Sequence, residues 1–181
     1  TISDKDADIQ DFPVSFSGTA QMDSLFFIDN KIVSGMTGYQ LVVPVMTIAG
    51  DIVLTNFGWL RGNAIRGQLP SLTSPVTALF SNQSQQFTGV VSYPSINTMV
   101  SETNIAFGKF PALLQQIDVT QIKQHLSATG ILTSGKLFHF VVNLSPQANS
   151  EFVRNWQLVV MSPDKLLGYA VQWLGLGIAA M

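Results

Sequence analysis

The fold of this protein is decided by residues 38–59, which read GYQLVVPVMTIAGDIVLTNFGW. Residues 39–48 are long, apolar and rich in β-branched side chains, as is typical of a strand. A turn at 49–51 leads into a second apolar run at 52–57, so the pattern predicts a β-hairpin. Pro44 has no N–H for a strand ladder, which predicts a sheet edge or a bulge at that point.

Short strands are predicted along most of the rest of the chain, because apolar and polar residues alternate there. They are expected at 12–20, 24–29, 76–80, 86–92, 137–143 and 156–161, with long loops at 61–75 and 93–111. Val119, Ile122 and Leu126 are spaced as on one face of a short amphipathic helix that ends near Gly130. Many short strands with one helix predict a mainly β fold, an antiparallel barrel or sandwich.

The two ends of the chain differ from this body. Residues 1–11 contain four Asp and one Lys and predict a solvated acidic arm. Residues 163–181 predict a helix with Ser162 as its N-cap. Residues 166–181 carry no charge and span about 24 Å as a helix, against about 30 Å for a bilayer core. This segment is either a buried terminal helix or the start of a membrane span, and residues 12–162 form one β domain.

The predicted terminal helix has two faces of different kinds. Helical spacing places Leu166, Tyr169, Trp173, Leu176 and Ala180 on one face, and Gly168, Gln172, Gly175 and Ala179 on the other. Small residues let another backbone approach closely, so the second face is predicted to bind a partner helix in lipid. Tyr169 and Trp173 suit the membrane interface. The alternative is a soluble helix packed on the β body.

The composition limits the function. The 181 residues correspond to about one domain, and only 11% of them are charged, with a net charge of -2. Because a basic surface for phosphates is missing, nucleic-acid binding is not expected. The sequence contains no Cys, which excludes thiolate metal sites, disulfides and thiol nucleophiles. Its two His are the only imidazole ligands.

The acidic and basic residues do not predict an active site. His125 lies on the predicted short helix, and His139 lies in a predicted strand. Neither shows a ligand spacing, so both are interpreted as structural or surface residues. Trp59, at the end of the hairpin strand, is predicted to close one end of the barrel. We expect no catalytic residue and no metal site, and therefore not an enzyme.

Three segments of the chain occur in a characteristic order. The first covers residues 27–70, the second is FPALLQQID at 110–118, and the third is NWQLVVMSPDKLLGYAVQW at 155–173. This ordered set resembles the surfeit locus protein 1 family of cytochrome c oxidase biogenesis factors, in its bacterial form. In the first segment the residues that match the family motif are Gly38, Tyr39, Asn56, Gly58, Trp59 and Arg66.

The resemblance implies a protein with two membrane spans in the plasma membrane of a bacterium, with the β domain on the periplasmic side. Family members are assembly factors that assist the delivery or insertion of haem a into oxidase subunit I. The implied partners are subunit I and other oxidase assembly factors. The implied cofactor is haem a, on the face of the terminal helix that carries Tyr169 and Trp173.

Two positions depart from the family pattern. The Arg of the family's hairpin motif corresponds to Phe57, which removes a guanidinium that can pair with a carboxylate or a haem propionate. The His of the family's terminal motif corresponds to Leu166, which has no lone pair for iron. We therefore expect no axial ligation of haem at residue 166.

Two other functions fit the same residues. A periplasmic or membrane-associated β-barrel can hold an apolar ligand between its strands. A structural subunit of another envelope complex can use a β domain as an interaction surface.

Overall fold

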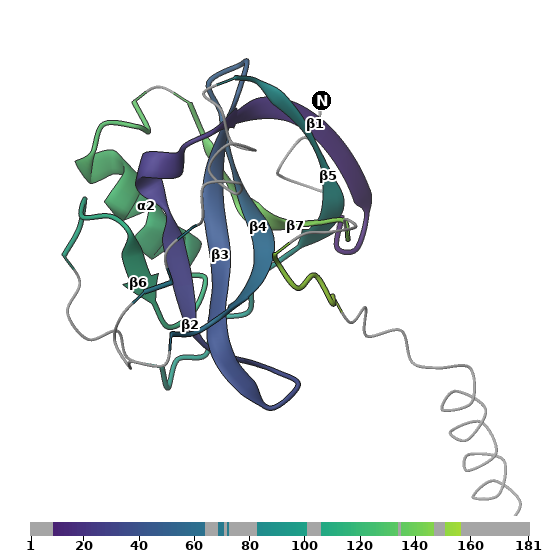
Figure 1. The fold of residues 1–181 in the computed structure, drawn as a ribbon. Coiled ribbons are helices and arrows are strands. Elements are labelled where there is room, and N and C mark those ends of the chain that lie inside the picture. Colours follow the sequence, from purple (N-terminus) through teal and green to yellow (C-terminus); the bar gives the residue numbers. More distant parts are fainter. Residues whose placement is uncertain are drawn as a thin grey trace, which may run out of the picture.

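The predicted hairpin is formed by β3 (Met36–Thr47) and β4 (Ile52–Arg61). The structure, a computed structural model, describes residues 9–63, 69, 70, 72, 83–100, 106–133, 135–146 and 151–156. The other elements are β1 (Pro13–Ala20), the 3-10 helix η1 (Met22–Ser24), β2 (Phe26–Val33), β5 (Gln85–Ser92), β6 (Ala112–Leu114), α2 (Val119–Ala128) and β7 (Leu137–Leu144) (Figure 1).

Five strands close into a barrel. The ring order is β1-β5-β7-β4-β3, and β1 returns to β3 through pairs that include Gly18↔Thr47 and Ala20↔Val45. Strands β2 and β6 extend the sheet beyond β3, with β6 parallel to β2. The fold is therefore mainly β, and of the two predicted architectures it is the barrel. The barrel is not purely antiparallel as predicted, because β4 and β7 pair in parallel.

Pro44 lies where the neighbour of β3 changes from β2 to β1. The Gln21 N–H donates to the Pro44 carbonyl at 2.9 Å, as in an antiparallel ladder. The reciprocal bond would need the N–H that proline lacks, and the Gln21 carbonyl instead accepts from the Ser24 N–H at 3.0 Å. The proline therefore lies at a corner between two partner strands. The register shift between β3 and β4 falls elsewhere, between Leu41 and Val42.

The inside of the barrel is filled by side chains. One buried cluster takes residues from all five strands of the ring, and such residues can meet only inside it. Its members are Ala20, Phe27, Leu41, Val43, Val45, Phe57, Phe87, Leu144 and Phe152. The rings of Phe57 and Phe87 lie edge to face with their centroids 6.1 Å apart, a geometry that aromatic pairs favour. The interior described here is a packed core, as in other small barrels.

Helix α2 covers the outer face of the sheet, on the same side as β6 (Figure 1). Asp118 caps it by accepting hydrogen bonds from the N–H groups of Thr120 at 2.8 Å and Gln121 at 3.3 Å. Ile122 and Leu126 are fully buried in a second cluster with residues of β2, β4, β6 and β7. The predicted amphipathic helix is therefore confirmed.

The predicted strands at 12–20, 24–29, 39–48, 52–57, 86–92 and 137–143 are confirmed, with small shifts at their ends. Strands β2 and β3 run further than predicted and meet in a turn through Ser34 and Gly35, both with positive φ. This second hairpin and the three-residue strand β6 were not predicted.

Other predicted elements lie outside the described residues. These are the strand at 76–80, nearly all of the strand at 156–161, the terminal helix at 163–181 and most of the arm at 1–11. Among the residues that the structure describes, no helix is both long enough and apolar enough to cross a membrane.

Candidate functional site

The indole of Trp59 crosses two neighbouring strands. A Cβ added to Gly38 on β3 would lie 2.6 Å from Cε2 and Cζ2 of this ring, so only glycine leaves room for it. Beyond Gly38, the Trp59 Nε1–H donates to the Lys31 carbonyl on β2 at 2.9 Å. Only 5% of Trp59 is exposed. This packing supports a structural role for Trp59. The indole does not close one end of the barrel as predicted, but ties β4 to β2 across the outer face of β3.

A bulge in β4 places Trp59 on that face. The register with β3 shifts and leaves Phe57, whose side chain lies in the barrel core, as an extra residue, so that the side chains beyond it change face. Gly58 follows with φ +127°, a region that favours glycine. The buried Asn56 side chain accepts the Gly58 N–H at 3.1 Å and so braces the bulge. Gly38, Asn56, Gly58 and Trp59 therefore serve one local structure. The remaining motif residue of β3, Tyr39, instead packs against the barrel core, with its ring edge to face with Phe27 at a centroid distance of 5.9 Å.

Residues 151–156 return to β4 at this bulge. Val153 exchanges two backbone hydrogen bonds with Trp59, each 2.9 Å long. A Cβ added to Gly58 would lie 2.7 Å from the Cβ of Phe152, so glycine also permits this close approach. The segment was not predicted, because a single bridge leaves no periodic pattern in the sequence.

Arg154 fastens the same segment with its side chain. Its Nε–H donates to the Phe57 carbonyl at 2.7 Å and an Nη1–H donates to the Ser145 carbonyl at 2.9 Å. Burial lowers the pKa of the guanidinium from its usual value, because desolvation disfavours the charged form. Trp156 adds an Nε1–H bond to the Leu144 carbonyl at 2.6 Å. We call residues 151–156, with Asn56, Gly58 and Trp59, the β4 anchor.

Phe57, which stands where the resembling family has an Arg, points away from solvent. Its ring is 1% exposed and lies 6.1 Å from Phe87 and 6.2 Å from Phe152, measured between centroids. A charge in this apolar setting would be costly without a partner. The guanidinium found at the bulge is that of Arg154, which contacts the Phe57 carbonyl.

The two histidines lie in different surroundings. His125 is buried on α2 and its ring lies against those of Phe26, Phe107 and Phe110, at centroid distances of 5.7, 4.9 and 5.9 Å. His139 is exposed on β7. In the described ranges no group of three His, Cys, Asp or Glu is placed to hold a metal ion.

The remaining predicted site residues lie outside the described part of the chain. They are Arg66, Leu166, Gly168, Tyr169, Gln172, Trp173, Gly175 and Ala179. Their roles in the haem-side face and the partner-helix face stay predictions.

Comparison with known proteins identifies one family. The model of the SURF1 family matches residues 2–178, which is nearly the whole chain. No curated protein matches the sequence.

Replacing Trp59 by Ala is expected to destabilise the protein by about 3 to 5 kcal/mol, because a buried indole is removed and its cavity cannot close across Gly38. Trp59→Phe keeps most of the buried area and is expected to cost less, about 1 to 3 kcal/mol, for the unpaired Lys31 carbonyl. Urea unfolding measures both values. A Trp59→Ala variant that unfolds like the parent but fails in oxidase assembly would contradict the structural role.

Replacing Gly58 by Ala is expected to release residues 151–156, because the new Cβ meets Phe152 and the backbone is strained. Trypsin should then cleave after Arg154 much faster than in the parent. Gly50→Ala is the matched control, since Gly50 also has positive φ but its Cβ would meet nothing within 4 Å. Equal resistance of the two variants at Arg154 would show that the close approach at Gly58 does not hold the segment.

Proposed function

Because the chain belongs to the SURF1 family, which is associated with cytochrome oxidase assembly, we propose that it is an assembly factor for a haem-copper cytochrome c oxidase. In this proposal it assists the delivery or insertion of haem a into subunit I. It acts in the plasma membrane with its β domain on the periplasmic side. Its partners are subunit I and other assembly factors, and it catalyses no reaction itself.

The observation that carries the proposal is the structural role of the residues that match the family motif. Asn56, Gly58 and Trp59 belong to the β4 anchor, and Gly38 leaves room for the Trp59 ring. Together these residues hold residues 151–156 against the barrel. An anchor of this kind fixes how the domain is presented by the chain that follows it. Presentation of a folded domain to a partner fits the proposed role of an assembly factor.

Neither the position of the family's axial histidine nor His125 fits a haem ligand. The position of the family's His is Leu166, which offers no lone pair. His125 is 2% exposed and three aromatic rings pack against it, so a porphyrin cannot reach its nitrogens in this arrangement. We therefore propose a role in haem a insertion that acts through protein partners, without iron ligation at residue 166 or at His125.

The binding of an apolar ligand inside the barrel has less support. The five ring strands point Phe57, Phe87 and other large side chains into the interior, where they pack against each other. A ligand between the strands would have to displace this core.

Deletion of the gene is expected to lower both cytochrome oxidase activity and the haem a content of membranes, because the active oxidase would not mature. Complementation with the parent gene should restore both. A gene that carries Gly58→Ala is tested in the same way, with a Gly50→Ala gene as its matched control. Normal oxidase activity with normal haem a after deletion would rule out the proposed function.

Haem is expected to cause no rise in melting temperature by axial ligation at residue 166. A ligand that binds only the folded state stabilises it by mass action, so true ligation would raise the midpoint as haem is added. Leu166→His, which restores the family's residue, is the matched variant. A low-spin haem complex in the unchanged protein would contradict this expectation and would direct attention to His125 and His139.

A further inference from the structure

The tip of the β2–β3 hairpin is rigid and apolar. Ser34 and Gly35 form a two-residue turn with φ values of 50° and 77°, the conformation of a tight type I′ turn. On either side of this turn, Ile32 is 67% exposed and Met36 is 39% exposed. A tight turn cannot fold back over these side chains, so they stay exposed to solvent.

A second apolar tip lies at the same end of the barrel. The turn at 97–100 is closed by bonds from the Val100 N–H to the Asn97 carbonyl and from the Met99 N–H to Asn97 Oδ1, both 3.0 Å. Two further bonds, of 2.9 and 3.3 Å, tie Asn97 to the Gln116 side chain. Gln116 lies just beyond β6, which runs parallel to β2 toward the hairpin tip.

The exposed residues of the two tips therefore share one end of the molecule. Met99 is 91% exposed and Ile96 is 53% exposed. We call Ile32, Met36, Ile96 and Met99 together the tip face. Single exposed apolar residues are common on protein surfaces, whereas a group of them at one end can mark an interaction site.

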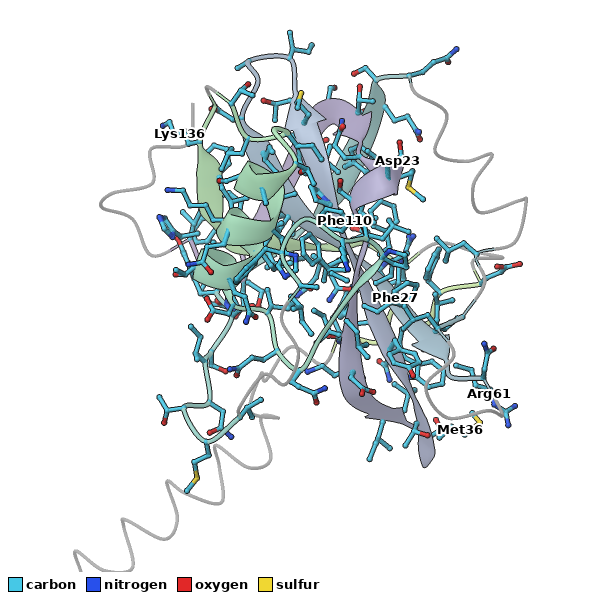
Figure 2. The ribbon with its side chains drawn as sticks, turned by 90° about the vertical axis from the view of Figure 1, so that its left-hand side faces the viewer. Asp23, Phe27, Met36, Arg61, Phe110 and Lys136 are labelled. Atoms are coloured by element: carbon cyan, nitrogen blue, oxygen red, sulfur yellow. The ribbon has the colours of Figure 1, made fainter. Side chains whose placement is uncertain are left out.

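Two cations lie behind the tip face, and the nearest preceding carboxylate of β2 is Asp29. Lys31 on β2 and Arg61 on β4 both lie in register with Gly38, so they form a row across three strands behind the hairpin tip. Figure 2 shows Arg61 beside Met36 at this end. Residues 30–37 and 94–100, which contain the two tips, include no acidic residue.

The opposite end of the barrel provides a contrast. Ile48, in the turn between β3 and β4, is 89% exposed, but the same turn contains Asp51. Asp23 and Lys136 also lie toward this end (Figure 2), and the Lys136 N–H donates to Asp51 Oδ1 at 3.0 Å. Exposed apolar side chains are thus present at both ends, but the two tip segments contain no carboxylate, whereas the turn that carries Ile48 contains Asp51.

We propose that the tip face binds the surface of an anionic lipid bilayer. In this arrangement the four apolar side chains enter the boundary between headgroups and acyl chains, as the apolar faces of interfacial proteins do. Lys31 and Arg61 lie one row behind them, at the level of the lipid phosphates. The barrel then stands with the β2–β3 hairpin toward the membrane and the β3–β4 turn away from it. This inference does not depend on the oxidase.

The test uses the absence of cysteine from the chain, which lets one introduced thiol carry a fluorophore. Ile32→Cys and Met99→Cys report the two tips, and Ile48→Cys is the matched control, because all three side chains are largely exposed and the labels should not disturb the fold. The full chain is reconstituted into vesicles of phosphatidylcholine and phosphatidylglycerol in a ratio of about 3:1, a composition that supplies an anionic surface. Lipids with a nitroxide near the headgroup then quench any label that enters the bilayer.

Both tip labels should be quenched several-fold more than the Ile48→Cys label. Removing the cations with Lys31→Gln and Arg61→Gln, or using phosphatidylcholine alone, should reduce the quenching at the tips; each cation is expected to be worth about a five-fold change in binding. Tip labels quenched no more than the control would overturn the proposal, and so would quenching at one tip only. Contact of the same thiols with oxidase subunits, without quenching in vesicles, would assign the face to a protein partner and also reject the lipid surface. Since the vesicles contain no oxidase, these results are independent of the proposed assembly function.

Discussion

The single extra residue in β4 determines which face every later side chain of that strand occupies. Because side chains alternate along a strand, an insertion of one residue reverses the phase beyond it. Phe57 is the last side chain on the core face before the shift, and Trp59 then emerges on the outer face, over Gly38. Without the bulge the indole would point into a core that is already filled by Phe57 and Phe87. The contacts of Trp59 with β2 and with residues 151–156 all depend on this reversal.

The fold could be predicted where it depends on local pattern. The alternation in residues 12–20 and the β-branched run beside Gly50 predict strands and a hairpin, and the spacing of Ile122 and Leu126 predicts α2. The choice between a barrel and a sandwich depends on the pairing of Gly18 with Thr47, which joins distant segments and has no local signal. The Ser34-Gly35 turn does have a local signal, since Ser-Gly pairs mark turns. It lies among residues whose apolar and polar side chains alternate only weakly, so the strands on either side of it were predicted too short.

The candidate site was predictable in part. The resemblance singles out Gly38, Asn56, Gly58 and Trp59, and the structure places them around one bulge. Geometry explains the two glycines. The Trp59 ring lies over Gly38, and another stretch of backbone packs against Gly58. That stretch, residues 151–156, could not be predicted, because it is held by one bridge and by side-chain bonds to carbonyls, which no residue pattern encodes.

Strand β4 connects the two regions to which this structure assigns a function. It pairs with β3 on one side and with β7 on the other, so it is central in the barrel wall and cannot shift alone. Its bulge binds residues 151–156, and its last residue, Arg61, lies in the cationic row behind the hairpin tip. Since close-packed cores resist deformation, residues 151–156 and the tip face are connected through one stiff barrel wall. In the proposed function, the β4 anchor, where Gly58 leaves no space for a side chain, fixes the barrel relative to residues 151–156 and so to the chain that follows them.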